Sequence, residues 1–123
     1  MADLEASLKD CMAITGAIGA CIVDYTSGMT LGTAGGGAEL DLEVAAAGNT
    51  EVVRAKMRTM DALGLNDTIE DILITLGTQY HLIRPVTSSR GQGLFIYLAL
   101  NKVTANLAMA RRSLAGVESA LTI

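Results

Sequence analysis

The sequence is poor in aromatic residues, proline and histidine, and these shortages exclude several kinds of protein. Tryptophan is absent, and three tyrosines and one phenylalanine are the only aromatic residues among 123. The formal net charge is −4, and no basic stripe is present. A chain without a basic surface and without aromatic platforms for base stacking is not expected to bind nucleic acid.

Candidate catalytic and ligand residues are equally scarce. His81 is the only histidine, and Cys11 and Cys21 lack metal-ligand spacing, so one subunit cannot supply a usual zinc site. The glycines between positions 32 and 37 lack the lysine and hydroxyl residue of a phosphate-binding loop. We therefore predict no catalytic, cofactor-binding or metal-binding residues, and a protein that is not an enzyme. The two cysteines are expected to be buried, reduced thiols.

Long hydrophobic runs are also missing. No charge-free apolar run approaches the ~20 residues needed to cross a bilayer, and the acidic start of the chain lacks the basic region of a secretory signal. We therefore expect a cytoplasmic protein without direct membrane insertion. Half of the residues are hydrophobic, which is more than a small monomer readily buries. A single domain over residues 1–123 that associates into oligomers is the simplest expectation.

Hydrophobic periodicity and turn residues predict the order α-β-β-α-β-β-β-α. The predicted helices cover residues 3–14, 39–63 and 101–123, and the predicted strands cover residues 17–23, 29–33, 68–76, 79–86 and 93–100. The last strand has no charged residue between Leu94 and Leu100, so it must be covered on both faces of its sheet. Asn101 is predicted to be the N-cap of the last helix.

Two of the predicted helices carry clear apolar stripes. The stripe of the last helix is expected to lie on the sheet, and its members are Val103, Leu107, Ala110, Leu114, Val117 and Leu121. The stripe of the long helix, which Val52 and Leu63 widen, consists of Leu42, Ala45, Ala46, Val53, Met57 and Met60. Gly64 is well placed to end that helix in the left-handed conformation. The long helix therefore has more apolar surface than one sheet contact needs.

The order of elements resembles that of the roadblock/dynein light chain family, which has a profilin-like fold. The local matches are Ile18 to Leu31, Tyr80-His81-Leu82-Ile83-Arg84-Pro85, and Asn106-Leu107-Ala108-Met109-Ala110-Arg111-Arg112. The closing helix is most similar to bacterial, actinobacterial members. The resemblance implies an α+β fold with a five-stranded antiparallel sheet in the order 2-1-5-4-3. The first and last helices would lie on one face and the long helix on the other.

The resemblance also implies a homodimer, in which third strands join edge to edge and long helices pack together. The dimer contacts that it implies are Leu42, Ala45, Ala46, Val53, Met57, Met60, Ile72 and Ile74. Bacterial relatives bind small Ras-like GTPases, and actinobacterial forms accompany a membrane histidine kinase. We therefore expect a non-catalytic regulatory or scaffold module that modulates the nucleotide cycle of a small GTPase. The expected GTPase contacts are Glu51, Arg54, Arg58 and Asp61.

An alternative hypothesis is a small-ligand sensor domain, because a sheet with helices on both faces can hold a pocket. A cavity lined by Tyr80, His81 and Arg84 would favour the sensor. A filled core and a large helical dimer surface would favour the scaffold. His81 has no nucleophile near it in sequence, so a structural role is favoured over general-base catalysis.

Overall fold

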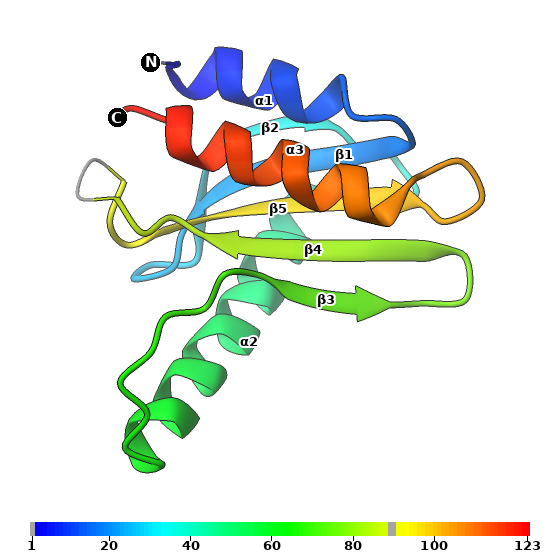
Figure 1. Ribbon diagram of the computed structural model, residues 1–123. Coiled ribbons are helices and arrows are strands. Elements are labelled where there is room, and N and C mark those ends of the chain that lie inside the picture. The colour runs from blue at the N-terminus through cyan, green and yellow to red at the C-terminus, as the bar shows by residue number, and fades with distance from the viewer. Residues whose placement is uncertain (1, 89–90) are drawn as a thin grey trace.

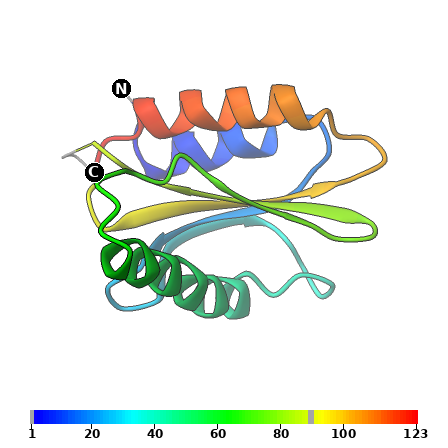
Figure 2. The ribbon, with the colours of Figure 1, turned by 60° about the horizontal axis from the view of Figure 1, so that its bottom comes forward.

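The computed structural model describes residues 2–88 and 91–123 and confirms the predicted order of elements. These elements are α1 (Leu4–Met12), β1 (Ala17–Asp24), β2 (Met29–Gly35), α2 (Leu42–Ala62), β3 (Ile72–Thr75), β4 (Gln79–Pro85), β5 (Leu94–Asn101) and α3 (Leu107–Ala120). The strands form one antiparallel sheet in the order β2-β1-β5-β4-β3. Figures 1 and 2 show α1 and α3 side by side on one face and α2 on the other. The predicted roadblock-type fold is therefore confirmed.

Strand β5 lies at the centre of the sheet and explains why its sequence does not alternate. It pairs with β1 on one side and β4 on the other, and every residue from Leu94 to Leu100 is buried. Ile96 and Leu98 belong to the core beneath α1 and α3, whereas Phe95 and Tyr97 belong to the core beneath α2. Each face of this strand thus packs against its own helical layer, as the uncharged sequence requires.

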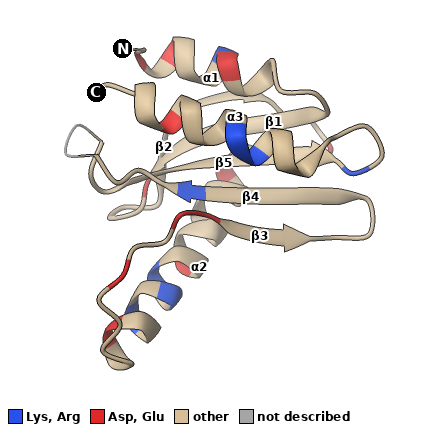
Figure 3. Cartoon of the chain, in the orientation of Figure 1, with Lys and Arg blue, Asp and Glu red and all other residues tan. Residues whose placement is uncertain are grey.

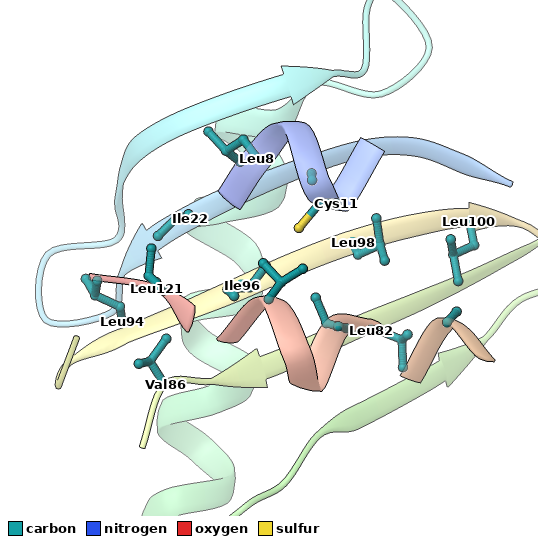
Figure 4. Packing of buried hydrophobic residues seen from close by; sticks show 14 residues of the cluster. Leu8, Cys11, Ile22, Leu82, Val86, Leu94, Ile96, Leu98, Leu100 and Leu121 are labelled. Atoms are coloured by element: carbon teal, nitrogen blue, oxygen red, sulfur yellow. The ribbon is translucent and has the colours of Figure 1, made fainter. Parts of the chain in front are cut away.

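The larger core lies between the sheet and the pair α1 and α3. Figure 4 shows Leu8 and Cys11 from α1 beside leucines and isoleucines of β1, β4 and β5. Four members of the predicted stripe of the last helix, Ala110, Leu114, Val117 and Leu121, are at most 8% exposed. An ion pair also joins this layer to the sheet, with 3.1 Å between Arg84 Nε on β4 and Glu118 Oε1 on α3. The placement of α3 on the sheet is thus confirmed.

The predicted start of the last helix is wrong by five residues. Asn106, not Asn101, is the N-cap, and its side chain accepts from the backbone N–H of Met109 at 3.1 Å. Asn101 ends β5 and caps a separate turn by accepting from the backbone N–H of Val103. Val103 is 90% exposed and does not belong to the stripe. The chain needs this extra turn to bring α3 back over the sheet, and Ala105 packs there close to Gly16, whose φ is +89°.

The predicted bounds of α2 and β3 also change. Helix α2 begins at Leu42 with Asp41 as its N-cap, so Glu39 lies in a turn before it. Its end agrees with the prediction, because Gly64 follows with a φ of +70°. Strand β3 covers only Ile72–Thr75. Asp71 precedes the strand and is held by Arg111 of α3 through two hydrogen bonds of 2.9 and 3.0 Å, which anchors the chain there outside the ladder.

The two cysteines lie where the sequence places them, in the interior. Cys11 and Cys21 are free, fully buried thiols. Burial raises the pKa of each thiol to about 12, because the thiolate would lose its hydration. None of the described helices combines the length and the apolar composition that a bilayer-spanning segment needs.

Candidate functional site

Helix α2 is the element that the sequence connects with binding, and its inner face is already used within the chain. Leu42, Ala46 and Val53 are at most 7% exposed and pack with Phe95 and Tyr97 beneath the sheet. These three residues were predicted to contact a second subunit, and the structure assigns them instead to the core of their own subunit. The spacing of a stripe shows that one face of a helix is buried, but it does not show which surface buries it.

The other predicted dimer contacts surround that core without being sealed in it. Ala45, Met57, Ile72 and Ile74 are partly buried against the cluster beneath α2, and Met60 is also partly exposed. Figure 1 shows that α2 crosses the sheet obliquely and that its C-terminal end lies beyond β3. Ala45, Met57, Ile72 and Ile74 therefore lie at the margin of the core beneath α2.

One side of α2 carries apolar surface that no part of the described chain covers. Val52 is 38% exposed and Leu63 is 65% exposed. Val52 lies seven positions after Ala45, and Leu63 lies eleven positions after Val52. These spacings correspond to about two and three turns of a helix with 3.6 residues per turn. The three residues therefore share one side of the helix, which we call the apolar flank (Ala45, Val52 and Leu63).

The four predicted GTPase contacts share the opposite side of α2, which we call the charged flank (Glu51, Arg54, Arg58 and Asp61). Their spacings of three, four and three place them in one row, and Figure 3 shows basic and acidic segments along this helix. Arg54 Nη1 lies 3.5 Å from Glu51 Oε1, and Arg54 also donates to the backbone oxygen of Thr26. Arg54 thus ties α2 to the β1–β2 turn. Arg58 and Asp61 form no ion pair among the described residues.

A cleft adjoins the end of the charged flank. It has a volume of about 340 Å³ and lies between the end of α2, residues 65–69 and the end of β4. Met60, Leu65 and Pro85 contribute apolar surface, and Asp61 places a carboxylate at the same cleft. The charged flank is therefore continuous with a concave surface that sequence patterns did not indicate, because its walls come from several segments far apart in the sequence, Tyr25 and Gln92 among them.

His81 lies in a polar network on the α2 side of the sheet. Its Nε2 is 2.7 Å from Gln79 Oε1, and its Nδ1 is 3.1 Å from the Tyr97 hydroxyl oxygen. The side-chain amide oxygen of Gln79 accepts a hydrogen bond from Nε2–H. Nδ1 then carries no proton and accepts a hydrogen bond from the Tyr97 hydroxyl. Burial lowers the pKa of His81, which favours this neutral form. Both ring nitrogens are thus satisfied by structural partners.

The cavity that would favour a sensor domain is not formed by the three residues proposed for it. Tyr80 packs against the core beneath α1 and α3, and Arg84 binds Glu118 of α3. His81 follows Tyr80 in the strand and faces the other side of the sheet, where its partner Tyr97 lies. Because neighbouring residues of a strand point to opposite faces, Tyr80, His81 and Arg84 cannot line one cavity.

Comparison with known proteins supports the fold. No family model matches the sequence, and no curated protein matches it. Among solved structures, the roadblock/LC7 domain from Streptomyces avermitilis superposes with a TM-score of 0.79 at 11% identity, covering 96% of this chain and 93% of that one.

Two further structures have the same architecture. MglB from Myxococcus xanthus gives a TM-score of 0.74 at 17% identity, with 93% of this chain and 77% of that chain covered. The gliding protein MglB from Thermus thermophilus gives 0.68 at 16% identity, with 94% and 88% covered. At these identities the likeness shows a shared fold, and it confirms the roadblock resemblance at that level.

Proposed function

We propose that the chain is a non-catalytic regulatory module that forms a homodimer and binds a small Ras-like GTPase. The fold supports this proposal, and the observation that carries it is the apolar flank of α2 beside an open sheet edge. Val52 and Leu63 expose apolar surface, and β3 is a terminal strand with one strand partner. Contiguous surfaces of this kind in soluble proteins are typically covered by a partner.

In the proposed homodimer, β3 strands meet edge to edge and the apolar flanks pack against each other. Ile72 and Ile74 lie on the α2 side of β3 and are only partly buried within one chain. A second subunit would complete their burial together with that of Ala45, Val52 and Leu63. Leu42, Ala46 and Val53 remain inside each subunit and act only by holding α2 in place.

The proposed GTPase surface is the charged flank, which points away from the apolar flank around the helix axis. Arg58 and Asp61 are both exposed, so water solvates their charges and both side chains are accessible to a partner. Switch regions are the parts of a small GTPase that differ between nucleotide states, so docking there would make binding depend on the nucleotide. A cytoplasmic location, a bacterial source and a complex with a histidine kinase complete the proposal.

Two measurements test the proposal. Light scattering of the purified chain should give roughly twice the 12.8 kDa mass of one subunit. Calorimetry against each small GTPase encoded by the source genome, loaded with GDP or a GTP analogue, should show one partner with nucleotide-dependent affinity. The chain alone should not bind GTP, because it lacks a phosphate-loop lysine. A monomer that binds none of these GTPases would contradict the proposal.

A further inference from the structure

Strand β2, at the opposite end of the sheet from β3, is an edge with little protection. It runs over seven residues, Met29–Gly35, and contains neither a charged residue nor proline. Edge strands are usually kept from pairing by charge, by proline or by being short. Strand β3 shows two of these features, since it has four residues and follows Glu70 and Asp71. Strand β2 has two irregularities, a register shift that leaves Leu31 without a partner on β1 and a φ of +70° at its last residue, Gly35.

Between these two irregularities, the backbone of β2 is ordered for pairing on its outer side. The N–H of Gly36 donates to the backbone oxygen of Ile18 at 2.9 Å, so these opposed residues form a hydrogen-bonded pair. Bonded and non-bonded pairs alternate in an antiparallel ladder. Gly32 and Ala34 therefore direct their backbone groups toward β1, whereas Thr33 and Gly35 direct theirs outward. No hydrogen bond from elsewhere in the described residues reaches these outward groups.

Exposed apolar side chains lie at the start of this edge. Met29 is 69% exposed and Leu31 is 42% exposed. Met29 pairs with Asp24, which pairs with Leu94 of the core beneath α1 and α3, so Met29 lies on that face of the sheet. Further along the strand, Gly32 and Ala34 lie against α1 and the same core. An added strand would thus find exposed apolar surface at the start of β2.

A hollow of about 290 Å³ lies at the other end of the same strand. It is lined in part by Thr33, Gly35, Asp41 and Glu43. Asp41 caps α2 through one carboxylate oxygen, and Glu43 forms no ion pair among the described residues. Two carboxylates outweigh the roughly half positive charge of a helix N-terminus, so the hollow favours a cation.

We propose that the outer edge of β2 binds an extended segment of a protein partner by strand addition, with a basic side chain of that segment in the hollow beside Glu43. The backbone groups of Thr33 and Gly35 would supply main-chain hydrogen bonds, and Met29 and Leu31 would contact an apolar side chain. The proposal is independent of the homodimer and of GTPase binding, because neither the apolar flank with β3 nor the charged flank includes a residue of β2 or of this hollow.

The test uses the full chain, labelled with ¹⁵N, and short synthetic peptides of alternating threonine and valine. One peptide has lysine at its first position and one at its last, because the partner strand can run either way. Matched peptides carry glutamate instead. We expect the amides of Thr33 and Gly35 to shift and to exchange more slowly with a lysine peptide. The glutamate peptides should bind about tenfold more weakly, which corresponds to about 1.4 kcal/mol, because an attractive charge is replaced by a repulsive one.

Variants locate the binding on the edge. Thr33→Pro removes one outward N–H and leaves the ladder to β1 intact, since edge strands accept proline where the N–H faces solvent. It should abolish peptide binding, whereas Thr33→Ala should keep it. Leu31→Lys adds a charge to the same edge and should also abolish binding, while Val103→Lys, which changes an exposed residue of the β5–α3 turn, should not. Glu43→Lys should reverse the preference for lysine peptides.

Several outcomes would overturn the proposal. One is the absence of any shift at Thr33 and Gly35 at millimolar concentrations of both lysine peptides. Another is unchanged binding to Leu31→Lys, which tests the edge even if Thr33→Pro does not fold. A third is a lower mass of Leu31→Lys in light scattering, because β2 would then join two copies of this chain rather than a foreign segment.

Discussion

The hydroxyl oxygen of Tyr97 on β5 lies 3.1 Å from Nδ1 of His81 on β4, and the two rings meet edge-on at 5.3 Å. Burial raises the pKa of Tyr97 to about 12, so its hydroxyl stays protonated and can donate a hydrogen bond to Nδ1. Gln79 occupies the other ring nitrogen of His81. The network therefore suits neutral histidine, and a proton added at Nδ1 would displace the bond from Tyr97.

This relationship predicts how stability depends on pH. Burial holds the pKa of His81 in the folded chain below the ordinary value of 6.5. The unfolded chain then binds more protons than the folded one as pH falls through that value, so the free energy of unfolding decreases. Urea unfolding between about pH 7.5 and pH 5.5 should show this decrease, and His81→Gln should show a smaller one. Equal slopes for both proteins would contradict the prediction.

Leu114 tests the packing of α3. Its side chain is 1% exposed in the core beneath α1 and α3. Leu114→Ala should lower the free energy of unfolding by about 2–5 kcal/mol, because it removes buried methyl groups and leaves a cavity. Met109→Ala on the same helix changes a side chain that is 65% exposed and should cost about 0.5 kcal/mol or less. Equal losses would mean that α3 is not seated as described.

The fold was predictable because buried strands and helix stripes leave a strong pattern. The uncharged run from Leu94 to Leu100 required a central strand, and the spacing from Ala110 to Leu121 required a helix on the sheet. The start of that helix was not predictable, because Asn101 and Asn106 are equally suitable N-cap residues. In the structure Asn101 caps the turn after β5 and Asn106 caps α3. Only the need to bring the chain back over the sheet, with Ala105 against Gly16, decides between them.

The candidate site was predictable only in part, for a related reason. The row of Glu51, Arg54, Arg58 and Asp61 follows from helical spacing, and the structure places these residues together. The sequence could not show that Val53 faces its own sheet while Val52 stays exposed, since neighbouring apolar residues look alike in a stripe. The sequence did not indicate that the edge of β2 could bind a partner. Whether a strand lies at the edge of a sheet depends on strand order rather than on residue type.

This difference between neighbours gives a matched test of the homodimer. Val53 is fully buried within one chain and Val52 is 38% exposed. Val53→Glu should unfold the subunit, because a buried unpaired carboxylate costs several kcal/mol. Val52→Glu should leave the thermal melting of the fold in place but halve the mass seen by light scattering. If Val52→Glu keeps the full mass, the apolar flank is not the dimer surface.

The charged flank gives the last prediction. Arg54 is occupied by Glu51 and Thr26, so replacing it would disturb the β1–β2 turn as well as any contact with a partner. Arg58 is exposed and has no ion-pair partner in the described chain, which makes it the cleaner probe. Arg58→Glu should weaken binding of the cognate GTPase about tenfold, and the loss should shrink at high salt because exposed charges are screened.

Arg112 supplies the matched control for Arg58. It is also exposed, and it lies on α3 across the sheet from α2, so Arg112→Glu makes the same change in net charge on the other face. Calorimetry with the GTPase in each nucleotide state should show wild-type affinity for Arg112→Glu and reduced affinity for Arg58→Glu, with both variants still dimeric. Equal losses in the two variants would mean that net charge, rather than the charged flank, governs association.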